Sequence, residues 1–164
     1  MWVLLIRPNT MYGLVVIATW LEAVMPYREK IAWLSLIAIV VTLGPYFVRA
    51  AVSPPSNELP GLDYLILFTI AGLAQAFLIG LGRWYLRHRS PLDARTPPDE
   101  RDRAIDSRSV AAAYYVLIVG VIMVGVVMPF NASGWEIINA ALFAVTMAEV
   151  VHYACVVTNY RLQS

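Results

Sequence analysis

The longest uncharged stretch of the chain runs from Ser109 to Trp135 and reads SVAAAYYVLIVGVIMVGVVMPFNASGW over 27 residues. A helix rises about 1.5 Å per residue, so about 20 apolar residues cross a hydrocarbon core of about 30 Å. This stretch therefore provides one membrane span and the turn after it. Three similar stretches lie at residues 31–48, 64–82 and 137–160, and only the last holds a charge, Glu149.

The overall composition points the same way. Of 164 residues, 60% are hydrophobic and 14% are charged, whereas soluble domains are about 25% charged. The net charge of +1 provides no basic field for nucleic acid, and the single Cys155 excludes an internal disulfide and a Cys-based metal site. We predict an all-α fold, a polytopic transmembrane helical bundle with four core helices near residues 31–51, 62–86, 109–130 and 135–160.

The N-terminal residues form a further apolar segment. Residues 8–21 are uncharged, and Glu22 and Pro26 follow. This length suits a short fifth span or an interfacial helix, and both remain open. A secretory signal is disfavoured because no basic region precedes the apolar run and Arg7-Pro8 interrupts its start. The predicted organisation is an N-terminal apolar segment, a first transmembrane hairpin, a charged connector and a second hairpin, at residues 1–26, 27–88, 89–108 and 109–164.

Basic residues predict the orientation. Segment 83–108 carries seven Arg, and Arg28, Lys30 and Arg161 fall on the same side of a four-helix core. The positive-inside rule therefore places segment 83–108 and the C-terminus in the cytoplasm.

The connector ends in a run of alternating charge. Pro98 suits the first turn of a short charged helix, acids after it suit the positive helix end, and Asp99 and Arg103 form an i,i+4 pair. This helix is expected to lead into the third core span. Three roles are open for this charged segment: contact with anionic lipid headgroups, ion pairing with a partner subunit, or that of a solvated connector. Its charged residues are Asp99, Glu100, Arg101, Asp102 and Arg103.

The two halves resemble each other. Gln75 and Glu149 follow Ala74 and Ala148, and each lies twelve residues before an Arg, Arg87 or Arg161. We predict two tandem hairpin repeats related by an axis along the membrane normal.

Glu149 is an acid near the middle of the last span. Insertion of a charged acid at that depth costs about 2.5–3.5 kcal/mol, so Glu149 is expected to face protein or a water cavity, or to be protonated. The repeat makes the Gln75 amide its expected partner. The functional interpretation is a proton or cation relay or a polar substrate site, and the structural one is hydrogen bonding between helices, which we favour. The candidate intramembrane polar site comprises Glu149, His152, Gln75, Tyr153, Thr146 and Asn139.

No cofactor or metal is expected. Glu149 and His152 have Glu-x-x-His spacing, but a di-iron site needs further carboxylates at the same depth. His88 lies at a helix end, about 13 Å from the depth of His152 at helical rise, which disfavours a bis-His haem within one chain. The only Lys, Lys30, lies at the membrane edge, which excludes a retinal Schiff base.

Small residues form a helix-packing face on the second core helix. Gly72, Ala76 and Gly80 recur every four residues, which permits close packing within the chain or between chains. Aromatic residues near helix ends are expected to anchor the interface with the lipid headgroups, namely Trp84, Tyr85, Trp135 and Tyr160.

The second half resembles a group of small uncharacterised prokaryotic multipass membrane proteins. The residues that carry the resemblance are Asp99-Glu100-Arg101-Asp102 before a hairpin, Glu149 in its last helix, and the closing pair Tyr160-Arg161. Gln75 in the first half departs from that pattern. The resemblance implies a prokaryotic integral membrane protein and no catalytic activity. With segment 83–108 and the C-terminus in the cytoplasm, the expected location is the inner (plasma) membrane of a prokaryote.

The sequence lacks the phosphate-binding, dinucleotide-binding and nucleophile-elbow motifs of soluble enzymes. We therefore expect no enzymatic activity, and partners limited to the lipid bilayer and either further copies of the chain or another membrane subunit. The leading expectation is a small protein that self-associates or serves as an accessory subunit. The alternatives are a small oligomeric transporter or channel that uses Glu149 and His152, and a haem- or quinone-linked redox subunit.

Overall fold

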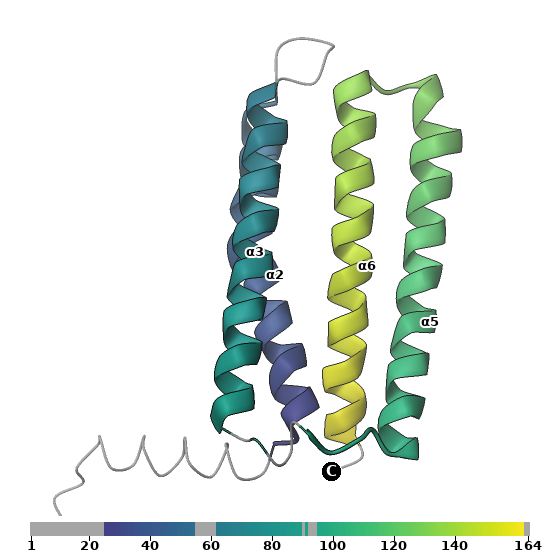
Figure 1. Cartoon of the computed structure of the whole chain (residues 1–164). Coiled ribbons are helices and arrows are strands. Elements are labelled where there is room, and N and C mark those ends of the chain that lie inside the picture. Colours follow the sequence, from purple (N-terminus) through teal and green to yellow (C-terminus); the bar gives the residue numbers. More distant parts are fainter. Residues whose placement is uncertain (1–24, 55–61, 90, 92–94, 163–164) are drawn as a thin grey trace, which may run out of the picture.

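The computed structural model describes residues 25–54, 62–89, 91 and 95–162 (Figure 1). Four long helices run along the molecule: α2 (Tyr27–Val52), α3 (Leu62–Arg89), α5 (Glu100–Ile122) and α6 (Gly134–Leu162). A π-helical turn (Met123–Val127) and a 3-10 turn (Met128–Phe130) extend α5. The predicted N-terminal apolar helix within residues 1–26 falls almost entirely outside the described residues.

All four helices are long and apolar enough to cross a membrane, and the described ranges contain no strand. The all-helical prediction is therefore confirmed. The helices extend past the predicted spans, mostly at the charged end. α2 begins at Tyr27 rather than residue 31, because Pro26 stands at its N-cap and the Pro26 carbonyl accepts from the amide of Lys30 at 3.1 Å.

Helix α6 is the central element of the bundle. It packs against α5 on one side and against α2 on the other, while α3 packs mainly against α2. Helices α3 and α5 therefore flank α6 without packing on each other, as Figure 1 shows. We call the end formed by Tyr27, Arg89, Glu100 and Leu162 the connector end, and the opposite end the turn end.

The core of the bundle is built chiefly by α2. Its buried positions follow helical spacing, with Ala32, Ile39, Leu43, Tyr46 and Ala50 all on its inner face. Helix α3 contributes no buried residue, and its apolar side chains, including Leu73 and Phe77, lie exposed. An apolar surface this extensive is rare on a soluble monomer and matches a helix in contact with lipid.

The charged run before the third span does not form a separate short helix. It makes the first turns of α5, which continues from Glu100 into the apolar stretch. Pro98 lies before the helix and outside its first turn, because Asp99 is the N-cap and its carboxylate accepts from the amide of Asp102 at 2.6 Å. The charged residues from Glu100 onward are therefore continuous with the helix that contains the third apolar stretch.

The end of the third span departs from α-helical geometry. Pro129 has no N–H group, and its ring would clash with the carbonyl of Gly125 in an α-helix. The chain instead widens into the π-helical turn, where the Met128 amide bonds the Met123 carbonyl, and then tightens into the 3-10 turn. Helix α6 restarts through a capping box, in which Ser133 and Glu136 exchange backbone-to-side-chain hydrogen bonds of 2.7 and 3.4 Å. Two hairpins result, and the tandem repeat between them stays a prediction.

Candidate functional site

Glu149 and Gln75 lie at matching depth, close to the midpoints of α6 and α3. The amide Nε2 of Gln75 donates a hydrogen bond of 3.3 Å to Oε2 of Glu149. The pairing expected from the spacing of the two halves is therefore present. Glu149 nevertheless remains exposed in the chain, because α3 and α5 leave the face of α6 between them uncovered.

Two other members of the predicted polar site have structural partners. Asn139 accepts a hydrogen bond of 3.3 Å from the hydroxyl of buried Tyr46, which joins α6 to α2. Thr146 donates to the carbonyl of Leu142 in its own helix at 2.9 Å. Both side chains thus act as packing elements, one between helices and one within α6.

His152 and Tyr153 line two cavities at once. The first cavity, of about 270 Å³, lies near the connector end and is lined by residues of all four helices, including Arg83 and Asp106. The second, of about 390 Å³, lies between α5 and α6 and has Glu149 in its wall. Glu149, His152 and Tyr153 therefore lie along these two cavities. Asn139 borders a separate cavity of about 520 Å³ near the turn end, and Thr146 lines none of the three.

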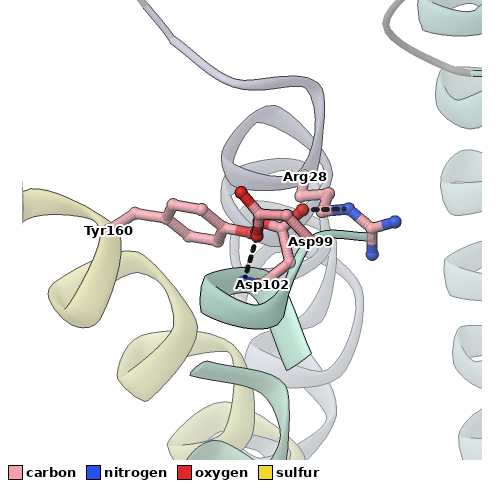
Figure 2. A network of polar contacts seen from close by, with 4 residues as sticks. All are labelled: Arg28, Asp99, Asp102 and Tyr160. Atoms are coloured by element: carbon pink, nitrogen blue, oxygen red, sulfur yellow. Dashed lines mark hydrogen bonds and ion pairs between the residues drawn. The ribbon is translucent and has the colours of Figure 1, made fainter. Parts of the chain in front are cut away.

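A polar cluster at the connector end joins three helices (Figure 2). Nε of Arg28 on α2 lies 3.2 Å from Oδ2 of Asp102 on α5. The other carboxylate oxygen of Asp102 accepts a hydrogen bond from the hydroxyl of Tyr160 on α6. The N-cap bond of Asp99 to the Asp102 amide holds the first turn of α5 in place beside them.

A second ion pair lies beside this cluster. Nε of Arg161 donates to Oε1 of Glu29 at 2.9 Å, joining the end of α6 to the start of α2. Glu29 is only 3% exposed, whereas the side chain of Arg161 is 56% exposed. The Arg161 guanidinium also lies 5.9 Å from the ring centroid of Trp33. This pair therefore closes the bundle at its connector end.

Only some of the charged residues predicted at the connector end make specific contacts. Asp99 and Asp102 make specific contacts, whereas Glu100 and Arg103 lie exposed. Among the described residues no ion pair joins the side chains of Asp99 and Arg103. The expectation for Tyr160 as an interface anchor is wrong, because the ring is buried and bonded to Asp102; Trp135 is likewise buried, against Tyr64.

Glu29 is the site residue that sequence reasoning missed. Its neighbours Arg28 and Lys30 are basic, so the sequence indicated only a positively charged segment at the membrane surface. The signal lay in the helical period of α2: counting back in steps of three and four from buried Ile39 through Ala32 reaches Glu29. A carboxylate on that inner face requires a cation from another helix, and Arg161 provides it.

The predicted small-residue face is not packed within the described part of the chain. A Cβ atom built on Gly72 or Gly80 would meet nothing within 4 Å, and Ala76 and Gly80 lie exposed. The close helix contacts occur at other glycines. Gly82 of α3 lies against the side chain of Leu34, and a Cβ on Gly120 of α5 would lie 2.5 Å from Cβ of Ala144 on α6.

Arg28, Asp102 and Tyr160 thus form a structural closure that also makes part of the wall of the first cavity. Glu149, His152 and Tyr153 line accessible space further along α6. Within the described ranges, no group of three or more His, Cys, Asp or Glu side chains is placed to hold a metal ion. No protein-family model, curated protein or solved structure matches the chain.

Proposed function

We propose that the chain is a multipass integral membrane protein without enzymatic activity that works through association with further copies of itself. The observation that carries this proposal is Glu149, an acid at the middle of α6 that stays exposed on the outside of the bundle. A partner in the membrane would cover it.

The energetics of an exposed intramembrane acid favour such a partner. A charged acid at the centre of a membrane costs about 2.5–3.5 kcal/mol. The Gln75 amide supplies one hydrogen bond, and a bond of this kind is worth about 0.6–2 kcal/mol. The remaining cost falls if a second chain excludes lipid and adds polar contacts.

The small-residue face supports the same conclusion. Gly72, Ala76 and Gly80 leave open space beside α3, and small residues let two helix backbones approach closely in a membrane. On a helical projection these residues turn away from α2 towards the uncovered side of α6. The face and Glu149 therefore support one interface formed by α3 and α6.

The proposed location is the prokaryotic inner membrane with the connector end in the cytoplasm. The basic residues of segment 83–108 and Arg28, Lys30 and Arg161 support this orientation through the positive-inside rule. The ion pairs of the connector end would then lie at headgroup level, where water and lipid phosphates are available.

Replacing Ala76 with leucine is expected to weaken association about tenfold or more, because the larger side chain prevents close approach of the two helices. Native mass spectrometry in mild detergent, with fluorescence energy transfer in liposomes of increasing lipid-to-protein ratio, would measure it. Ala74→Leu is the matched control: Ala74 is also exposed on α3 but faces the opposite side.

Self-association is contradicted if wild type stays monomeric at every lipid-to-protein ratio. If a different membrane protein copurifies with wild type and is lost with Ala76→Leu, the face serves an accessory subunit of a larger complex instead.

A second candidate function is transport by an oligomer, and the two adjoining cavities favour it. His152 and Tyr153 line both the cavity at the connector end and the one that holds Glu149. This arrangement supports a route for protons or cations from the connector end to the middle of α6.

For that candidate, proteoliposomes with wild type are expected to take up protons or cations. Glu149→Gln is expected to abolish the flux, because the amide has neither a negative charge to attract a cation nor a proton that it can exchange at neutral pH. Glu136→Gln is the control, since Glu136 caps α6 at the turn end. Flux assays with a pH-sensitive dye would measure both. Equal flux in wild type and Glu149→Gln removes Glu149 from the mechanism.

A further inference from the structure

The cavity at the connector end is lined by polar and charged side chains of all four helices. Arg28 of α2, Arg83 of α3, Asp106 of α5 and His152 of α6 all reach it. Its volume is about 270 Å³, and the bundle closure formed by Asp102 and Tyr160 makes part of its wall. It is therefore a cavity built by residues far apart in the sequence.

The charges that line this cavity are incompletely matched within the chain. Arg83 and Asp106 project from α3 and α5, which do not pack on each other, and neither makes an ion pair with another described residue. Arg28 uses only Nε in its ion pair with Asp102, and Figure 2 shows its two terminal nitrogens pointing away from Tyr160 and Asp99. The cavity thus offers guanidinium groups on one side and a carboxylate on another.

This cavity adjoins the second cavity described above, which is an apolar groove. The groove, of about 390 Å³ between α5 and α6, shares His152 and Tyr153 with the cavity and continues along Ala113, Leu117 and Val145. Glu149 contributes to its wall, but the carboxylate is directed at Gln75 on α3, so the aliphatic part of the side chain is available to line the groove. A charged compartment therefore leads into an apolar one along the length of the bundle.

We propose that the cavity and groove together bind one zwitterionic phospholipid with a phosphoethanolamine head. Its phosphate would lie on Arg83 and the terminal nitrogens of Arg28, because guanidinium groups bind phosphate oxygens with paired hydrogen bonds. Its ammonium group would lie on Asp106, and one acyl chain would fill the groove. This proposal does not depend on self-association.

Charge complementarity selects this occupant over two others. An anionic lipid head would leave Asp106 facing a negative charge without a cation. A water-soluble phosphoethanolamine would satisfy the charges but leave the apolar groove unfilled, losing the favourable burial of the chain. A molecule with both charges and an apolar tail matches both compartments. A primary ammonium also donates hydrogen bonds to the Asp106 carboxylate, which a quaternary ammonium cannot do.

Lipid titration of delipidated protein in mild detergent, read by native mass spectrometry, tests the head. Phosphatidylethanolamine is expected to bind about tenfold or more tightly than phosphatidylglycerol or chain-free glycerophosphoethanolamine. Arg83→Gln and Asp106→Asn are each expected to weaken phosphatidylethanolamine binding about tenfold, because each removes one charge-assisted hydrogen bond. Arg87→Gln and Glu100→Gln, at the same end but outside the cavity lining, are expected to bind like wild type.

A matched pair on α5 tests the groove. Ala113 lines it, whereas Ala111 lies exposed and outside its lining. Ala113→Phe is expected to weaken phosphatidylethanolamine binding about tenfold or more by filling the groove, while Ala111→Phe leaves it unchanged. Circular dichroism confirms that each variant is folded. Equal binding of phosphatidylglycerol, equal binding of the chain-free head, or unchanged binding in Arg83→Gln, Asp106→Asn and Ala113→Phe overturns the proposal.

Discussion

Gly120→Ala is expected to lower the free energy of unfolding by about 1–3 kcal/mol, the usual cost of overpacking. The added Cβ would lie 2.5 Å from Cβ of Ala144 and 3.5 Å from its Cα. Neither atom belongs to the end of a flexible side chain, so the backbones of α5 and α6 must shift apart at this contact. Unfolding by sodium dodecyl sulfate in mixed micelles, followed by circular dichroism, would measure the change.

Two comparisons isolate this contact. Gly72→Ala adds the same methyl group where nothing lies within 4 Å, and it is expected to be neutral or to stabilise by up to about 1 kcal/mol through helix propensity. Ala144→Gly in the Gly120→Ala background exchanges the methyl group between the helices and is expected to recover more than half of the loss. If Gly120→Ala and Gly72→Ala behave alike, the close contact of α5 with α6 is absent.

Arg161→Ala is expected to lower the free energy of unfolding by about 2 kcal/mol. Removing one partner of a buried ion pair costs about 3–5 kcal/mol because the other charge is left uncompensated. Glu29 is 3% exposed, but the side chain of Arg161 is 56% exposed, so water already screens part of the interaction. The same unfolding titration would measure the loss.

The unequal burial of the two partners makes a sharper prediction. Glu29→Leu is expected to cost less than Arg161→Ala, because Arg161 regains water when unpaired whereas Glu29 does not. The double variant Glu29→Leu/Arg161→Ala is expected to be more stable than Arg161→Ala alone. Arg87→Ala, at the same end and without an ion pair in the described structure, serves as the control. A loss below about 0.5 kcal/mol for Arg161→Ala, the usual range for surface changes, would contradict a structural role for the pair.

The parts of the fold that depend on one helix at a time could be predicted from the sequence. Uncharged length is enough to place four helices, because a bilayer-spanning helix must satisfy its own backbone and needs about 20 apolar residues. The equal spacing of Gln75 to Arg87 and Glu149 to Arg161 also predicted their common depth, since rise per residue is constant. Neither inference requires knowing which helices pack against each other.

The parts that depend on neighbours could not be predicted. A helix that is apolar on every side has no face that marks its partner, so the sequence could not tell the packed Gly82 and Gly120 from the open Gly72 and Gly80. Likewise, an acid such as Asp102 is expected in the first turn of a helix. Its contacts with Arg28 and Tyr160, however, depend on the positions of the start of α2 and the end of α6. The expected contact between Gln75 and Glu149 is present in the structure, whereas the contacts of the connector end were not predicted.

The central position of α6 imposes an order on assembly. Chains are synthesised from the N-terminus, so α2, α3 and α5 emerge before the helix that packs between α2 and α5. Until α6 emerges, Glu29 has no Arg161 and Asp102 has no Tyr160. The hairpin formed by α2 and α3 therefore carries an acid, Glu29, whose ion-pair partner is supplied only when the last helix is in place.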